Sequence, residues 1–255
     1  MALRFTSLGS GSSGNALVVE SGTTRVMMDC GFSIAETCMR LARVGLAPGD
    51  LAGIVVTHEH DDHLGGVARF AKRYALPVYL TRGTAQWLPE DFPAVLVRYI
   101  DSHRPFAVDG LAVEPFPVPH DAREPVQYVF SDGAARLGVV TDLGCITQHV
   151  VDKLSGCEAL VIECNHDLDM LMSGPYAVSL KQRVAGRFGH LDNAGARHLV
   201  ASLDRSRLRH LIAAHLSQQN NTPALARKAL ATAAGCEEDW IGVASQLDGF
   251  AWRDA

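Results

Sequence analysis

Two groups of predicted β-strands, each followed by alternating helices and strands, constrain the fold of this 255-residue chain more than any other feature. The first group lies near the start of the chain, where LRFTSLG, NALVVES and TRVMMDC are divided by glycine-rich turns. The second group contains VQYVF and RLGVVTD, joined by the turn SDG as a hairpin. This order predicts two sheets packed together with helices outside them, an α/β fold with the four layers of an αβ/βα sandwich.

The predicted helices alternate with further strands. The first helix has a capping-box arrangement, with Ser33 before it and Glu36 three residues later, and Gly45 can end it. We expect helices over Ile34–Val44, Leu64–Tyr74, Gly83–Leu88, Ile146–Leu154, parts of Ser173–Arg187, Asn193–Leu203 and Pro223–Ala234. A closing strand is expected at WIGVAS. Because no low-complexity linker or charge run marks a boundary, residues 1–255 are predicted to form a single domain.

Composition excludes several classes of protein. The net charge of -5 and the isoelectric point near 6.1 give no global attraction to nucleic acid or to an anionic membrane, although a local basic groove remains possible. No apolar stretch is long enough to span a bilayer, and the start of the chain has no export signal, so we expect no membrane partner and a cytoplasmic location. The six cysteines lack CxxC spacing and are expected to be free; Cys30, beside Asp29, is the one whose reactivity deserves a test.

The segment HEHDDH follows the apolar run LAGIVV and concentrates groups that bind metal ions. His58 and His60 are two residues apart in a loop that leaves a strand, so their imidazoles can project to one side. Asp62 and His63 begin the following helix and can turn toward a second, nearby point. Two separable pairs of ligands fit two ions better than one. The alternative is a hydrated loop whose histidines only titrate, with Glu59 and Asp61 pointing away in either case.

Three further candidates stand where other apolar runs stop. These are His120 after VEPFPVP, Asp142 at the end of RLGVVTD, and His215 at the end of HLIAAH. Sites in open α/β architectures collect at strand ends. Each residue alone could be an ordinary loop residue, but together they complete a ligand set with the first four.

In order along nearly the whole chain, MMDCG, THEHDDHLGG, PHDA, VVTDLG and AAHLS resemble the motifs of the metallo-β-lactamase superfamily. The resemblance implies that His58, His60 and His120 bind one ion, that Asp62, His63 and His215 bind the other, and that Asp142 bridges both. It gives Asp29 a structural role and not that of a ligand. It also implies the metallo-β-lactamase fold.

The expected cofactors are two divalent metal ions per chain. Nitrogen and oxygen ligands suit zinc first, with manganese or iron as alternatives. A water between two such ions is expected to become hydroxide at neutral pH, with Asp62 as the proton acceptor. This superfamily hydrolyses β-lactams, thioesters, lactones and phosphodiesters, so the fold alone does not choose the bond.

Two residues in the second half of the chain favour a phosphodiester as the substrate. Glu163 in VIECNHD and His190 in GRFGHLDN are similar to a pair found in the phosphodiesterase branch of the superfamily, which includes tRNA-processing nucleases. A histidine held by a carboxylate can donate a proton to a phosphoryl or leaving oxygen. The simpler reading of His190 is a residue that starts a helix.

The resemblance narrows to the bacterial YycJ/WalJ-type branch through LGSGSSGN, ECNHD, GHLDN and HLSQQNN, and that branch is associated with DNA exonuclease activity. One departure is Asp192, where the branch more usually has serine, and its charge could weaken binding of a polyanion. His166 could contact substrate or be a plain loop residue. Gly9–Asn15 could bind a phosphate or, more simply, form a tight turn.

The expected partner is a phosphodiester, either DNA or a small linear or cyclic molecule. Tentative DNA contacts are Lys181, Arg183 and Arg187 in SLKQRVAGR, which could equally be a solvated helix face. A thioester or lactone hydrolase is a further alternative, and the oligomeric state, monomer or dimer, stays open.

Overall fold

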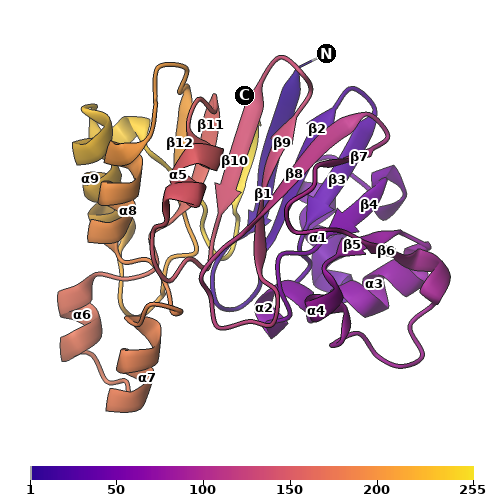
Figure 1. Cartoon of the computed structure of the whole chain (residues 1–255), viewed down its shortest axis with the longest axis horizontal. Coiled ribbons are helices and arrows are strands. Elements are labelled where there is room, and N and C mark those ends of the chain that lie inside the picture. The colour runs from indigo at the N-terminus through magenta and orange to yellow at the C-terminus, as the bar shows by residue number, and fades with distance from the viewer. Residues whose placement is uncertain (1) are drawn as a thin grey trace.

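The computed structural model describes residues 2–255, and its strands form two sheets that pack face to face (Figure 1). The first sheet has the order β14-β1-β2-β3-β4-β5-β6 and the second the order β13-β12-β11-β10-β9-β8-β7. The strands of the first sheet are β1 (Leu3–Gly9), β2 (Ala16–Ser21), β3 (Thr24–Met28), β4 (Gly53–Val55), β5 (Val78–Leu80), β6 (Val97–Tyr99) and β14 (Phe250–Asp254). Those of the second are β7 (Phe106–Val108), β8 (Leu111–Pro117), β9 (Val126–Ser131), β10 (Arg136–Val140), β11 (Ala159–Glu163), β12 (His210–Ala214) and β13 (Gly242–Val243).

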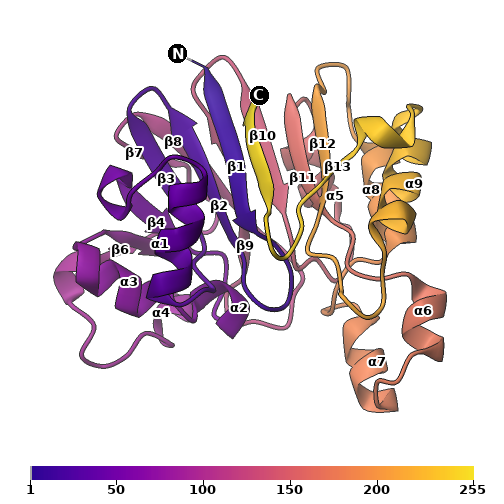
Figure 2. The same cartoon turned by 180° about the vertical axis from the view of Figure 1, so that it is seen from behind.

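Helices cover both outer faces of this pair of sheets, as the two opposite views in Figures 1 and 2 show. On the first sheet lie α1 (Ile34–Arg43), α3 (Val67–Tyr74) and α4 (Arg82–Ala85), and the short α2 (Asp61–Leu64) lies at the lower edge. The second sheet is covered by α5 (Gln148–Leu154), α8 (Asn193–Ser202) and α9 (Pro223–Ala234). Two further helices, α6 (Leu168–Ser173) and α7 (Val178–Val184), project beyond the sheets at the edge where α2 lies.

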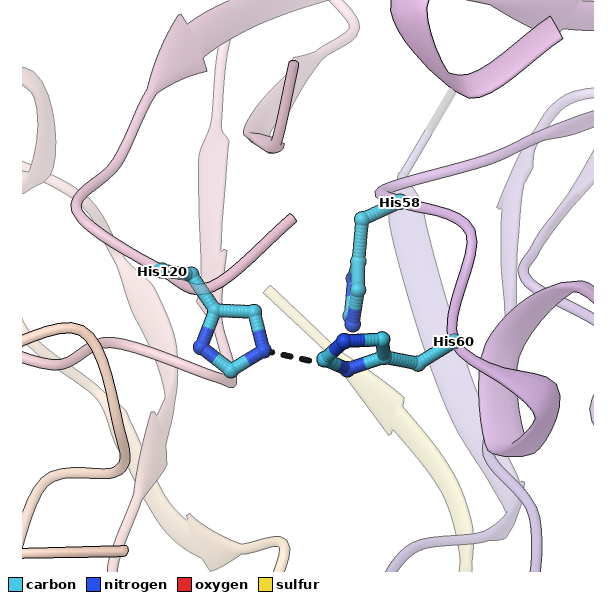
Figure 3. Close-up of side chains that lie close together, drawn as sticks. All are labelled: His58, His60 and His120. Atoms are coloured by element: carbon cyan, nitrogen blue, oxygen red, sulfur yellow. Dashed lines mark hydrogen bonds between the residues drawn. The ribbon is translucent and has the colours of Figure 1, made fainter. Parts of the chain in front are cut away.

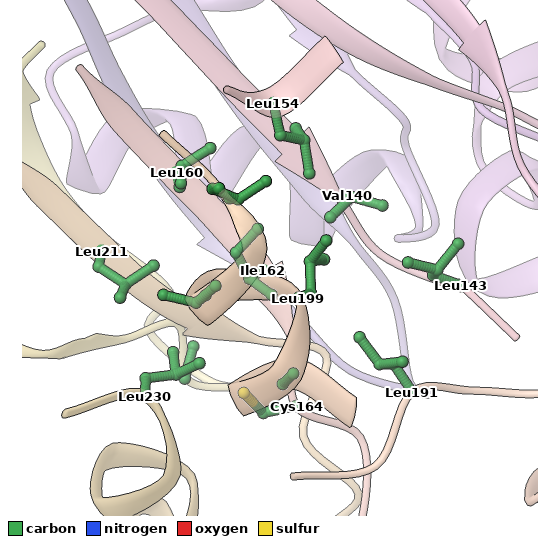
Figure 4. Close-up of a cluster of buried hydrophobic side chains, with 14 of the residues drawn as sticks. Val140, Leu143, Leu154, Leu160, Ile162, Cys164, Leu191, Leu199, Leu211 and Leu230 are labelled. Atoms are coloured by element: carbon green, nitrogen blue, oxygen red, sulfur yellow. The ribbon is translucent and has the colours of Figure 1, made fainter. Parts of the chain in front are cut away.

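Successive side chains along each strand point to opposite faces of its sheet, so the buried side chains form three layers: one between the sheets and one under the helices on each outer face. Val55 of β4 faces the other sheet, whereas Ile54 faces the helices on the outside. In β11, Val161 packs between the sheets and Ile162 packs under α8, within the outer cluster drawn in Figure 4. Strands buried on both faces are apolar at nearly every position. This explains the continuous apolar runs, and the predicted αβ/βα sandwich is confirmed.

The first predicted helix begins and ends as its sequence indicates. The side chain of Ser33 accepts a hydrogen bond from the backbone of Glu36, and Gly45 follows α1 with φ of 77°. The reciprocal half of the capping box is replaced, because Glu36 instead forms an ion pair with Arg40, with 2.6 Å between Oε1 and Nε.

Three other expectations need correction. The predicted helix over Leu64–Tyr74 is divided between α2 and α3, because the backbone N–H of Gly66 donates to the carbonyl of Cys30 and not to that of Asp62, which accepts from Asn15. Helix α6 lies ahead of the predicted helical region at Ser173–Arg187. The closing strand is β14, which pairs antiparallel with β1, and not the segment at WIGVAS, which contains only the short β13. None of the helices in residues 2–255 is both long and apolar enough to cross a membrane.

Candidate metal centre

All seven predicted ligands lie at one edge of the sheets, on the loops that leave β4, β8, β10 and β12 and in α2. Asp142 and His215 follow their strands with φ of 54° and 53°, and Asp29 follows β3 with φ of 60°. A positive φ is sterically costly for a residue with a Cβ, although Asp and His tolerate it better than most. The fold therefore concentrates backbone strain at the site.

Three histidines form the first group. His58 and His60 come from the loop after β4, and His120 comes from the loop after β8; their rings converge in Figure 3. Nδ1 of His60 lies 3.3 Å from Nε2 of His120, and the three ligand atoms lie within 4.8 Å of one another. Nε2 of His58 is buried and has no hydrogen-bond partner in residues 2–255. A buried nitrogen of this kind costs free energy unless a ligand engages it.

The second group joins Asp62 and His63 of α2 to His215 after β12. Oδ2 of Asp62 lies 3.2 Å from Nε2 of His215 and 3.5 Å from Nε2 of His63. Asp142 lies between the two groups: its Oδ2 is 2.9 Å from Nε2 of His63, and its Oδ1 is 3.9 Å from Nε2 of His120. The structure thus brings together the residues that the sequence assigns to two ions and to a bridge.

Electrostatics divide the histidines into two groups. Burial and the neighbouring imidazole of His63 lower the pKa of His58, and burial lowers the pKa of His120, which favours the neutral form of each. Burial would also lower the pKa of His63 and of His215, but Asp142 and Asp62 outweigh it and raise both. Those two positions attract positive charge, which a divalent cation supplies in place of protons. Five imidazoles and two carboxylates fit two zinc-like ions.

Asp29 holds His63 without belonging to the ligand groups. Its Oδ2 lies 2.8 Å from Nδ1 of His63, and its Oδ1 accepts a hydrogen bond from the backbone of Thr57. Nδ1 of His120 lies 3.0 Å from the carbonyl oxygen of Gly189. Such partners fix the ring so that Nε2 points at the site. The expected structural role of Asp29 agrees with this placement.

The glycine- and serine-rich loop at Gly9–Asn15 has a role that sequence reasoning missed. Asn15 donates a side-chain hydrogen bond to Oδ2 of Asp62, and its backbone donates to the carbonyl of Asp62. The hydroxyl of Ser10 accepts from the backbone of His215. The loop therefore joins two ligands from distant segments. The GSSGN pattern signals a turn, but it does not signal which residues that turn will meet.

Glu163 and His190, the pair that the sequence singled out, are hydrogen-bonded to each other beside the ligand groups. Oε1 of Glu163 lies 2.8 Å from Nδ1 of His190, while Oε2 accepts hydrogen bonds from the backbones of Leu143 and Leu191. Burial would lower the pKa of His190, but the charge of Glu163 and this hydrogen bond raise it to about 9. Nδ1 of His190 is also 3.2 Å from Oδ1 of Asp142, so the pair adjoins the bridge.

The three basic residues that were predicted to contact DNA do not all lie at the site. Arg183 lines a cavity of about 290 Å³ that also contains Asp62, Asp142, His190 and His215. Lys181 instead donates to the carbonyl of Met172 at the end of α6, and neither it nor Arg187 is among the residues that line this cavity within 2–255.

His166 and Asp192 are not among the residues that line this cavity within 2–255. His166 is buried, and its backbone pairs with Asp192. Asp192 caps α8 by accepting from the backbone of Gly195, which a serine could do equally well. Glu59 accepts a hydrogen bond from the backbone of Arg123, so it points away from the ligands, as expected, and ties two loops together.

Comparison with known proteins agrees with this geometry. Residues 24–215 match the model of the beta-lactamase superfamily domain. The chain is 34% identical to exodeoxyribonuclease YycJ of Bacillus anthracis, over 97% of this chain and 94% of that protein. It is 30% identical to exodeoxyribonuclease WalJ of Streptococcus pneumoniae, over 95% of this chain and 92% of that protein. The structure superposes on the metallo-β-lactamase fold protein YhfI of Bacillus subtilis with a TM-score of 0.77 at 16% identity, and each chain is covered completely.

Proposed function

The chain belongs to the metallo-β-lactamase superfamily, and from this premise we propose that it is a two-metal phosphodiesterase that removes nucleotides from the ends of DNA. The observation that carries the proposal is His190, which lines the cavity beside Asp142 and is held from behind by the buried Glu163. Hydrolysis of a phosphodiester in DNA releases an alkoxide, which is a poor leaving group until it is protonated. A histidine held in this way can supply that proton. A thioester leaves as a thiolate and needs no such donor.

Relatives support DNA as the substrate. Two relatives matched along almost their whole length are exodeoxyribonucleases. The net charge of -5 gives no general attraction for a polyanion, so phosphate recognition must be local, at the metal centre and Arg183.

Zinc is our first candidate for both ions, because imidazoles dominate the ligand set, and manganese or iron are the alternatives. When bound, the two ions would supply an acidified water and neutralise charge on the phosphoryl oxygens.

Residues of the chain supply the remaining functions. Asp62 lines the cavity; burial would raise its pKa, but the charge of His63 and the hydrogen bond to His215 lower it, so the carboxylate is ionised and can accept a hydrogen bond from the attacking water. His190 donates a proton to the leaving oxygen, with Glu163 holding its ring. Arg183 binds a neighbouring phosphate at the cavity edge.

A panel of four substrates tests the proposal. Purified, metal-loaded protein would be given bis-p-nitrophenyl phosphate, a 5′-phosphorylated DNA duplex, a lactone and a thioester, with chelator-treated protein as the control. We expect metal-dependent cleavage of the first two. Turnover of only the lactone or the thioester would refute the phosphodiesterase.

A small linear or cyclic phosphodiester is the second candidate, and the size of the cavity favours it. About 290 Å³ lies just below the usual range of small-molecule sites, roughly 300–1,000 Å³. Turnover of the small diester with no cleavage of DNA would select this candidate.

A further inference from the structure

One wall of the catalytic cavity is apolar, although nothing in hydrolysis of a phosphate requires it to be. Leu180 and Val184 are four residues apart in α7 and therefore share one face of it, and Tyr176 lies in the bend just before the helix. All three line the cavity together with Asp62 and His190. The cavity thus joins a charged surface, which suits a phosphate, to an apolar surface.

Helix α7 is held in place beside the metal centre by contacts near its C-terminal end. Nε of Arg183 lies 2.6 Å from Oδ2 of Asp121, the residue after His120. The backbone of His190 donates to the carbonyl of Val184, and the backbone of Asp121 donates to the carbonyl of Phe188. The C-terminal part of the apolar wall is therefore fixed relative to the same loops that carry His120 and His190.

We propose that this wall binds the nucleoside of the terminal nucleotide, with Tyr176 as the residue on which its base stacks. The proposal rests on the proposed phosphodiesterase function and specifies its substrate class: a nucleic-acid end with a base. A phosphate bound at the metal centre would have its own nucleoside beside α7, because the two surfaces share one cavity. Base–aromatic stacking tolerates any sequence, as removal of successive nucleotides demands.

The size of the cavity limits what can enter. About 290 Å³ is small for an enzyme site, so the part of the substrate that enters it is about the size of one nucleotide.

The test compares two single-stranded DNA oligonucleotides that differ only in whether both terminal nucleotides carry bases. Wild-type protein should cleave the abasic-ended oligonucleotide with kcat/KM lower by about tenfold, the effect of one stacked base. Tyr176→Ala should lower cleavage of the intact oligonucleotide to the abasic level and lose the discrimination. Tyr176→Phe, which keeps the ring, should discriminate as wild type does.

Val178→Ala is the matched control, because Val178 lies on the same helix, is 70% exposed and is not among the cavity-lining residues. Thermal melting and metal content establish that Tyr176→Ala is folded; if it is not, Leu180→Ala replaces it. Equal rates of the wild type on both oligonucleotides, or full discrimination by the folded variant, would overturn the proposal. Methyl p-nitrophenyl phosphate, which has no base, separates the two hypotheses. If wild type hydrolyses it but cleaves the intact and the abasic-ended oligonucleotides equally, only the nucleoside wall is refuted. If wild type hydrolyses no phosphodiester at all, the proposed function is refuted.

Discussion

His190 and Glu163 lie 2.8 Å apart between Nδ1 and Oε1, and the other carboxylate oxygen of Glu163 is held by two backbone N–H groups. The carboxylate is thus fixed, and it fixes the imidazole in turn. Because Nδ1 of His190 also lies 3.2 Å from Asp142, the geometry allows two roles for this histidine: proton donor or additional ligand.

His190→Ala distinguishes these roles. We expect the variant to keep two metal ions per chain and to lose about 100- to 10,000-fold in kcat on a phosphodiester, the usual contribution of general acid catalysis. Elemental analysis and steady-state kinetics provide the two measurements. His198→Ala is the control, because His198 is an exposed histidine on α8. Loss of one ion from His190→Ala would identify His190 as a ligand.

Removal of the metal ions should destabilise the fold. Without them, His58 keeps a buried nitrogen with no partner, and the remaining histidines and acids compensate one another only in part. We expect chelation to lower Tm by several degrees and added zinc or manganese to restore it, as binding to the folded state requires. Scanning calorimetry with a titration of metal measures the shift and the stoichiometry.

Substitution of single ligands should affect the two ions unequally. Asp142→Asn is expected to weaken the binding of both ions, because Asp142 lies between the two groups. His60→Ala is expected to weaken the binding of one ion only. Asp152→Asn, on the exposed side of α5, is the matched control. If Asp142→Asn and His60→Ala lose the same number of metal ions per chain, as measured by elemental analysis, Asp142 does not bridge the two ions.

Asn15→Ala should weaken the ion at Asp62, His63 and His215 by about 10- to 100-fold, the usual effect of losing a partner that orients a ligand. The first ion should be retained, because Asn15 has no contact with its three histidines. Metal titration of Asn15→Ala beside Ser13→Ala, whose side chain is exposed in the same loop, measures this difference. Identical titrations would mean that the loop does not orient the site.

Cys30 should be inert despite its position next to Asp29. Burial raises the pKa of its thiol to about 11, so near pH 7.5 fewer than about one thiol in a thousand is ionised. Iodoacetamide followed by mass spectrometry should modify Cys38 and Cys145, which are partly exposed, long before Cys30. The rate at Cys30 should rise as pH approaches 11. Rapid labelling of Cys30 at neutral pH would contradict the burial of this thiol.

The sequence predicted which seven side chains converge because each has a local signal: a dense motif, or a polar residue where an apolar strand stops. It could not predict the contact of Asn15 with Asp62, which depends on how two distant loops meet. The wall around Tyr176 was missed for the same reason, since α7 is positioned by the ion pair between Arg183 and Asp121. Among the tentative basic contacts, only Arg183 reaches the cavity, and Lys181 serves to join α7 to α6.

The positive φ angles of Asp29, Asp142 and His215 have a practical consequence. Glycine at any of these positions would relieve steric strain while removing a ligand or its support. Screening metal-free protein for heat resistance would therefore favour variants that have lost their metal centre, so such a screen must keep the metal bound or measure activity from the first round.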